Sequence, residues 1–290
     1  MYPYDADLLF NCLRTIYGIT LYEEFMMPKS PTAFYQPTTL PEALKLLAEP
    51  DVMPLAGGTK LLAGDVPGAV VDLQKLGLTA VTHNTTTLTI GAALPLAELA
   101  DALAEDGDVP TPAALLQQAI TLAGPNTYRN AATLGGTIAS RLPDSELLAA
   151  LLVLDAVLTL HTPALVQMSL AEYLAAEERP SGLITAVTLA WEAGQGRSER
   201  VARTPRDYPI VSVTLWQPQN GDVRLAATGL RERPCRLTAA ETQLAKGLTP
   251  DAITQAAQAA QAAATHPGDF RGDTNYRAEM TAVLTRRVCK

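Results

Sequence analysis

Two copies of the tripeptide Gly-Gly-Thr constrain the fold of this chain more than any other feature. The first copy ends the run LAGGT at residues 55–59, and the second ends TLGGT at residues 133–137. Glycine lacks a Cβ atom, so consecutive backbone N–H groups can point to one side and approach a ligand closely. Such concave runs of N–H groups bind phosphate without a basic side chain, and the following threonine adds a hydroxyl donor. One copy alone is typical of an ordinary tight turn, but two copies beside apolar, strand-like runs predict two loops that converge on one phosphate or pyrophosphate.

Polar residues flank the second copy on both sides. Arg129 could neutralise a phosphate, although the simpler role for Arg129 and Asn130 is to hold loop carbonyl groups. On the other side, Asp144 or Glu146 could accept a hydrogen bond from a ribityl or ribose hydroxyl. Capping of the following helix by Asp144 or Ser145 is the alternative, and the two roles can coexist on different residues.

Composition excludes several function classes. The chain has 290 residues, which favours two domains, and its 22 Lys and Arg residues against 30 Asp and Glu residues give a formal net charge of -8. A nucleic-acid surface needs clustered basic residues, so that partner is not expected. Cys12, Cys235 and Cys289 are too few and too far apart to hold an iron–sulfur cluster, and scattered cysteines suit a reducing cytoplasm. The histidines show no metal-binding spacing and are interpreted as loop residues: His83, His161 and His266.

The first half of the chain mixes short strands with helices, which predicts an α+β fold. Thr39 and Glu42 form a capping-box pattern at the start of a helix whose apolar face includes Leu40, Leu44 and Leu47. We expect strands at residues 52–55, 69–73, 86–92 and 157–160. We expect further helices at residues 96–103, 112–122 and 147–154. The apolar run 147–160 contains Asp155 and is too short to span a bilayer.

The remainder predicts a second unit. Strands are expected at residues 182–191, 210–217 and 222–230, and helices at residues 239–245, 251–264 and 274–288. The polar segment 194–197 is interpreted as a loop near the domain boundary. Residues 1–27 show helical spacing at Leu9, Leu13 and Ile16 but lack the basic start of a secretory signal. They predict either an amphipathic arm or a misassigned start, with Met26 or Met27 as the initiator.

Taken together, the ordered motifs resemble one family. The runs LAGGTKLL, AVVDLQKLGLTAV, LTIGAAL and PNTYRNAATLGGTIASRLPDSELLAALLVLDA, followed by DFRGDTNYR at residues 269–277, resemble the FAD-binding medium subunit of the molybdenum hydroxylases. That family includes carbon monoxide dehydrogenase, xanthine dehydrogenase and related aldehyde or aromatic hydroxylases. Each glycine turn alone is a weak signal, but the ordered set is specific, and it covers nearly all of the chain except residues 1–27.

The resemblance implies a fold and a domain organisation. It implies a PCMH-type FAD-binding domain of two subdomains, at about residues 28–81 and 82–200. A smaller α+β domain at residues 201–290 should follow, with a three-stranded antiparallel sheet and helices. Residues 1–27 would be an N-terminal extension.

The resemblance also implies a set of FAD-binding residues. The two glycine loops should hold the pyrophosphate through backbone N–H groups and threonine hydroxyls. Glu146 stands where the family commonly has aspartate, so Asp144 is an alternative contact for the FAD hydroxyls. Thr127 stands where members often have glutamine, so that amide contact is lost. Tyr208 matches an aromatic that covers the flavin ring in some members, although a core tyrosine at a strand edge is equally expected. The full implied set is Leu55, Ala56, Gly57, Gly58, Thr59, Lys60, Leu61, Asn126, Arg129, Thr133, Leu134, Gly135, Gly136, Thr137, Asp144, Glu146, Arg206 and Tyr208.

The implied activity is electron transfer. The chain would be the flavoprotein component of a cytoplasmic oxidoreductase, a heterotrimer with a molybdopterin-binding large subunit and a small subunit carrying two [2Fe–2S] clusters. Non-covalent FAD would take electrons from those clusters and pass them to NAD, quinone or oxygen, and no catalytic base or metal ligand is needed from this chain. Two alternatives remain open: a self-contained FAD-dependent oxidase of the same fold, and a scaffold that has lost the cofactor.

Overall fold

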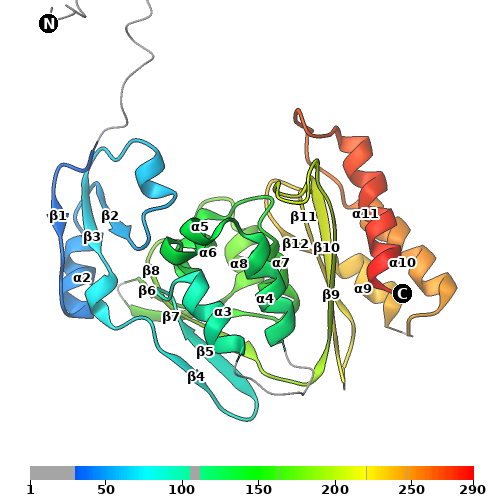
Figure 1. The fold of residues 1–290 in the computed structure, drawn as a ribbon, viewed down its shortest axis with the longest axis horizontal. Helices are drawn as coiled ribbons and strands as arrows, with labels where there is room; N and C mark the ends of the chain where they lie inside the picture. Colours follow the sequence, from blue (N-terminus) through cyan, green and yellow to red (C-terminus); the bar gives the residue numbers. More distant parts are fainter. Residues whose placement is uncertain (1–29, 105–111, 163, 220, 246) are drawn as a thin grey trace, which may run out of the picture.

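The computed structural model describes residues 30–104, 112–162, 164–219, 221–245 and 247–290. The interpretations of residues 1–27 lie outside these ranges. Three sheets follow one another along the longest dimension of the molecule, with helices between and beside them (Figure 1). The arrangement confirms the predicted α+β class.

The first sheet delivers the first glycine loop. It has the order β1-β3-β2, with β1 at Phe34–Tyr35, β3 at Ala69–Asp72 and β2 at Val52–Leu55, and all pairs are parallel. Helix α2 (Leu40–Leu47) connects β1 to β2 and packs on the sheet. The loop after β2 continues into the short 3₁₀ helix η1 (Leu61–Ala63), and a second one, η2 (Gln74–Leu76), follows β3.

The capping box predicted before α2 forms with one difference. The hydroxyl of Thr39 accepts a hydrogen bond from the Glu42 N–H group at 3.4 Å. The Glu42 carboxylate, however, accepts from the N–H group of Thr38 at 3.4 Å and not from that of Thr39. The helix start is therefore as predicted, but the reciprocal bond is displaced by one residue.

The middle sheet is antiparallel and has the order β4-β5-β8-β6-β7. Its strands are β4 (Val81–His83), β5 (Thr87–Gly91), β6 (Val157–Thr162), β7 (Ala164–Ser169) and β8 (Leu183–Ala190). The predicted strand at 182–191 exists but belongs to this sheet, because its alternating apolar face packs into the large core of the middle region. It therefore does not contribute to the C-terminal sheet.

The helices of the middle region carry the second glycine turn. They are α3 (Leu96–Ala104), α4 (Ala113–Leu122), α5 (Asn126–Ala131), α6 (Leu134–Ser140), α7 (Glu146–Val153) and α8 (Leu170–Ala175). Every residue of α7 is buried. Helix α7 lies between the middle region and the C-terminal sheet, where it packs on β10 and β11 (Figure 1).

The C-terminal sheet has four antiparallel strands, where the sequence predicted three. Its order is β12-β11-β10-β9, with β9 at Gly194–Val201, β10 at Val211–Pro218, β11 at Arg224–Thr228 and β12 at Cys235–Arg236. The segment 194–197 is thus a strand and not the predicted loop. It pairs with β10 along its whole length, and as an edge strand it can keep polar and charged side chains in solvent.

Three helices cover the outer face of this sheet: α9 (Thr238–Leu244), α10 (Pro250–Ala262) and α11 (Thr274–Val288). Arg277 on α11 is completely buried. Its guanidinium donates to the carbonyl groups of Ile210 and Gly229 and to the carboxylate of Asp269, at 2.6 to 2.9 Å. Arg277 therefore fixes the turn at Asp269 to the ends of β10 and β11.

In the part of the chain that the structure describes, no helix is long and apolar enough to cross a membrane.

Candidate functional site

The two glycine loops lie against each other, as the sequence predicted. A Cβ atom added to Gly57 would stand 1.6 Å from the carbonyl oxygen of Ala131 and 3.2 Å from the nitrogen of Ala132. Ala131 ends α5 and Thr133 caps α6, so Gly57 contacts the backbone immediately before the second turn. Only glycine permits this approach of the two segments.

The first loop presents a run of N–H groups. Gly58 has φ of 68°, which glycine adopts without strain. Among the described residues, the N–H groups of residues 57–61 donate to no protein acceptor, and the next N–H group, of Leu62, donates to the carbonyl of Gly58 at 2.9 Å. Leu55 and Ala56 lead into the loop, half-buried beside it. The loop therefore offers successive donors to a ligand.

The second turn is used differently. The N–H groups of Leu134 and Gly135 donate to the carbonyls of Leu94 and Ala92, at 3.0 and 2.7 Å. Those of Gly136 and Thr137 donate to the hydroxyl and carbonyl of Thr133, at 3.1 and 2.9 Å. The interpretation that both loops offer their amides to the ligand therefore needs correction for these four residues, since a helix cap and a loop contact already use their amides.

Two tyrosines and a lysine flank the first loop. The Nζ atom of Lys60 lies 5.6 Å from the ring centre of Tyr128 and 6.0 Å from that of Tyr208. Burial raises the pKa of the Tyr128 phenol, and the interaction with the Thr59 side chain opposes the shift. The Tyr208 hydroxyl donates to the carbonyl of Ala123 at 3.5 Å. Tyr208 is 40% exposed, so it is not a core tyrosine.

Arg129 has the simpler of its two predicted roles. Its guanidinium donates to the carbonyls of Thr121 and Gly124, both at 2.9 Å, and also to the side chain of Asn126. Arg129 and Asn126 therefore stabilise the loop before α5. Arg206 is exposed on the segment between β9 and β10.

The two candidate carboxylates have different partners. Asp144 forms an ion pair with Arg271 at 3.0 Å, and Ser145 caps α7 by accepting from the N–H group of Leu148. Glu146 is 6% exposed and lies 3.4 Å from Arg200 on β9. Burial raises the pKa of Glu146 to about 7, with Arg200 opposing the shift and Asp144 adding to it.

Glu146 also keeps one oxygen without a partner. Its Oε1 atom is buried and accepts no hydrogen bond from the described residues. A buried acceptor left without a donor costs about 1 to 3 kcal/mol. The position is therefore suited to accept a hydrogen bond from a ligand hydroxyl, whereas the carboxylate of Asp144 is held by Arg271.

Three residues of the site were missed by the sequence interpretation: Tyr128, Arg200 and Arg271. Tyr128 stood inside the quoted motif next to Arg129, so its position was a usable signal. Arg271 stood in the closing motif. Arg200 gave no signal, because its segment was not assigned to the sheet. Among the described residues, no group of three or more His, Cys, Asp or Glu side chains could hold a metal ion.

The chain matches two family models in tandem. Residues 29–191 match the FAD binding domain in molybdopterin dehydrogenase, and residues 199–290 match the CO dehydrogenase flavoprotein C-terminal domain. The predicted limits at residues 81 and 200 remain predictions.

Relatives and solved structures extend over most of the chain. The glyceraldehyde dehydrogenase medium chain of Sulfolobus acidocaldarius is 28% identical over an alignment of 276 residues that covers 89% of this chain and 97% of the relative. The carbon monoxide dehydrogenase medium chain of Hydrogenophaga pseudoflava is 24% identical over an alignment of 275 residues that covers 88% of this chain and 94% of the relative. A chain of reconstituted CO dehydrogenase from Oligotropha carboxidovorans has the same fold, with a TM-score of 0.81, 23% identity, and coverage of 91% of this chain and 97% of that one.

Proposed function

Because the chain belongs to the FAD-binding medium subunits of the molybdenum hydroxylases, we propose that it transfers electrons from [2Fe–2S] clusters on a partner subunit to an external acceptor. The hydroxylation of substrate would take place at a molybdopterin-binding large subunit. The acceptor would be NAD, quinone or oxygen, and the complex would be cytoplasmic.

The observation that carries this proposal is the free amide run at residues 57–61 beside the second glycine turn. A diphosphate needs several donors on one side, and this loop supplies them without a salt bridge. The second turn would support the loop by its contact at Gly57, and the exposed Gly136 marks where the ligand could lie against it.

The surrounding side chains fit the rest of FAD. Oε1 of Glu146 would accept a hydrogen bond from a hydroxyl of the cofactor, and this donor would favour the carboxylate form, lowering the pKa of Glu146 below its value near 7. Tyr208 is the candidate aromatic contact for the flavin ring, and Lys60 lies next to it. FAD supplies one- or two-electron exchange when bound, so the proposed role of this chain's residues is to hold and orient it.

The experiment is co-expression of the chain with its molybdenum and iron–sulfur partners, followed by flavin and metal analysis. We expect about one FAD per chain and bleaching of the flavin absorbance when substrate is added without acceptor. A complex that turns over substrate while its flavin stays oxidised under those conditions would contradict the proposal. Turnover by the isolated, FAD-loaded chain would support the alternative of a self-contained oxidase.

A further inference from the structure

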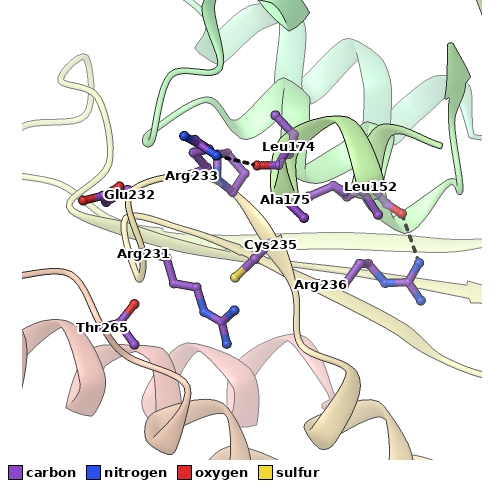
Figure 2. Close-up of a pocket in the computed structure, with 11 residues that line it drawn as sticks. Leu152, Leu174, Ala175, Arg231, Glu232, Arg233, Cys235, Arg236 and Thr265 are labelled. Carbon is purple, nitrogen blue, oxygen red and sulfur yellow. Dashed lines mark hydrogen bonds between the residues drawn. The ribbon is translucent and has the colours of Figure 1, made fainter. Parts of the chain in front are cut away.

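A half-open cavity of about 480 Å³ lies away from the glycine loops, at the junction of the middle region and the C-terminal sheet. Figure 2 shows α8 and the end of α7 on one side and the segment 231–236 on the other, with Thr265 below. None of its lining residues belongs to the proposed FAD-binding set.

The two sides differ in chemistry. The side formed by α7 and α8 is apolar and is lined by Leu152, Ala171, Leu174 and Ala175. The segment opposite contributes three arginines to the lining, Arg231, Arg233 and Arg236, with Glu232 as the acidic residue. The guanidinium groups of Arg233 and Arg236 reach across to the carbonyls of Leu174 and Leu152, so these two cations lie beside the apolar residues, whereas that of Arg231 lies apart from them (Figure 2).

Two of these arginines have no carboxylate partner among the described residues. Arg236 is neutralised, because it pairs with Glu241 at 2.7 Å and also with Asp155. Arg233 instead donates to backbone carbonyls, among them that of Glu177 at 2.8 Å. Arg231 donates through Nε to the carbonyl of Ala263 at 3.1 Å, which leaves the terminal nitrogens of its guanidinium for another acceptor.

A further arginine adds to the positive charge. Arg141 donates to the same carbonyl groups as Arg233, those of Leu174 and Ala176. Its Nε atom is buried without a partner. Burial lowers the pKa of Arg141, and the charges of Arg233 and Arg179 lower it further. Cations collected in this way are stabilised by an anion, and guanidinium groups bind carboxylate and phosphate oxygens with favourable geometry.

We propose that this cavity binds a small organic anion, with a carboxylate or phosphate head against Arg231 and an apolar body against Ala171 and Leu174. Arg231 supplies the fork geometry for the head through its terminal nitrogens, and Arg233 adds positive charge while its own terminal nitrogens donate to backbone carbonyls. The apolar wall excludes water from the body and gives an aromatic or aliphatic acid an advantage over a bare inorganic ion. The site is independent of the proposed electron transfer, because it shares no residue with the glycine loops.

The test uses the full-length chain in excess FAD, which occupies any phosphate-binding position at the glycine loops. Phenyl phosphate, benzoate and inorganic phosphate are titrated separately by calorimetry. We expect saturable binding of phenyl phosphate or benzoate at one site, and at least tenfold weaker binding of inorganic phosphate. Equal affinity for phenyl phosphate and inorganic phosphate, or no saturable binding of either organic anion, would overturn the proposal.

Variants then locate the site. Arg231→Gln removes a charge from an exposed side chain, and Ala171→Glu places a carboxylate on the apolar wall within the first turn of α8, where an acidic residue is tolerated by the helix dipole. Both should weaken binding at least tenfold. Ala171→Gln separates bulk from charge and should weaken it less than Ala171→Glu, and Lys45→Gln on α2 should leave it unchanged. Unchanged affinity in both Arg231→Gln and Ala171→Glu, with unaltered circular dichroism, would place the anion elsewhere.

Discussion

The two Gly-Gly-Thr turns have the same local sequence but different hydrogen bonding. After β2, the N–H groups of residues 57–61 donate to no acceptor in the described part of the chain, and Gly57 is held against Ala131. At the start of α6, the N–H groups of residues 134–137 all donate within the protein, and Gly135 packs against Ala92. The first turn therefore offers donors to a ligand, whereas the second supports the position of the first.

The difference teaches that a glycine turn does not specify its own function. Both glycine pairs permit close backbone approach. What distinguishes them is whether a neighbouring carbonyl lies within reach of the amides, and this depends on the β5–α3 connection, which is remote in sequence from the second turn. Substitutions at matched positions in the two turns test whether their roles differ in this way.

The largest effect is expected for Gly57→Ala. The new Cβ would stand 1.6 Å from the Ala131 carbonyl oxygen, so the loop must move and its amides lose their direction. We expect FAD retention after gel filtration to fall at least a hundredfold. Gly64→Ala is the matched control in the same loop, because its Cβ meets no atom within 4 Å. Equal flavin content in the two variants would refute the role of this loop.

Gly135→Ala should act on stability and not on the ligand. Its Cβ would lie 2.8 Å from the Cβ atom of Ala92 and 2.9 Å from the Ala92 carbonyl oxygen. Overpacking of this kind costs about 1 to 3 kcal/mol of unfolding free energy. Chemical denaturation measures this loss, and titration of the folded variant measures FAD affinity. A large loss of FAD affinity at unchanged stability would show that the Gly135 amide binds FAD directly.

Glu146→Gln tests the buried carboxylate beside the second turn. The folded-state pKa of Glu146, about 7, lies above the ordinary glutamate value. Folding therefore favours the protonated form, and the unfolding free energy of the native chain, in the absence of FAD, falls as pH rises through 7. Because glutamine does not titrate, the variant should lose about 2 to 3 kcal/mol less than the native chain between pH 5 and pH 8.5. Parallel pH profiles in thermal unfolding would contradict the raised pKa.

Tyr128→Phe should have the smallest effect. It removes the hydroxyl that interacts with Thr59 in the first loop but keeps the ring beside Lys60. Such an interaction contributes no more than a hydrogen bond, about 0.5 to 1.5 kcal/mol. We expect FAD affinity to fall less than tenfold, with unchanged secondary structure. An effect as large as that of Gly57→Ala would show that the hydroxyl, and not the amide run, dominates binding.

Much of the fold could be predicted, because its signals are local. Apolar periodicity located the helices α3, α4, α7, α10 and α11 to within a few residues. The sequence also marked the cap of α2 at Thr39 and narrowed that of α7 to Asp144 or Ser145, of which Ser145 is the cap. Strand β9 was missed because its polar side chains follow no apolar alternation; its pairing with β10 stabilises it through the backbone. The sequence also did not show to which sheet β8 belongs, because the order of strands in a sheet depends on tertiary contacts.

In the candidate site, too, features with a local sequence signal were predicted and those set by distant residues were not. The contact between the two glycine loops was predicted from the repeated motif. The partners of Asp144 and Glu146 were not, because Arg271 and Arg200 reach them from the C-terminal sheet and its flanking turn. The amide bonds of the second turn were not foreseen either, since the acceptor at Ala92 lies on another connection.

The ion pair of Arg271 with Asp144 joins residues separated by 127 positions, and Arg271 itself stands on the turn that Arg277 fixes to the ends of β10 and β11. Ribosomes make the chain from its N-terminus, so both glycine loops are translated long before the turn that carries Arg271. The partner of Asp144 is therefore made near the end of synthesis, and a nonsense codon ahead of Arg271 would leave an otherwise nearly full-length product without this ion pair.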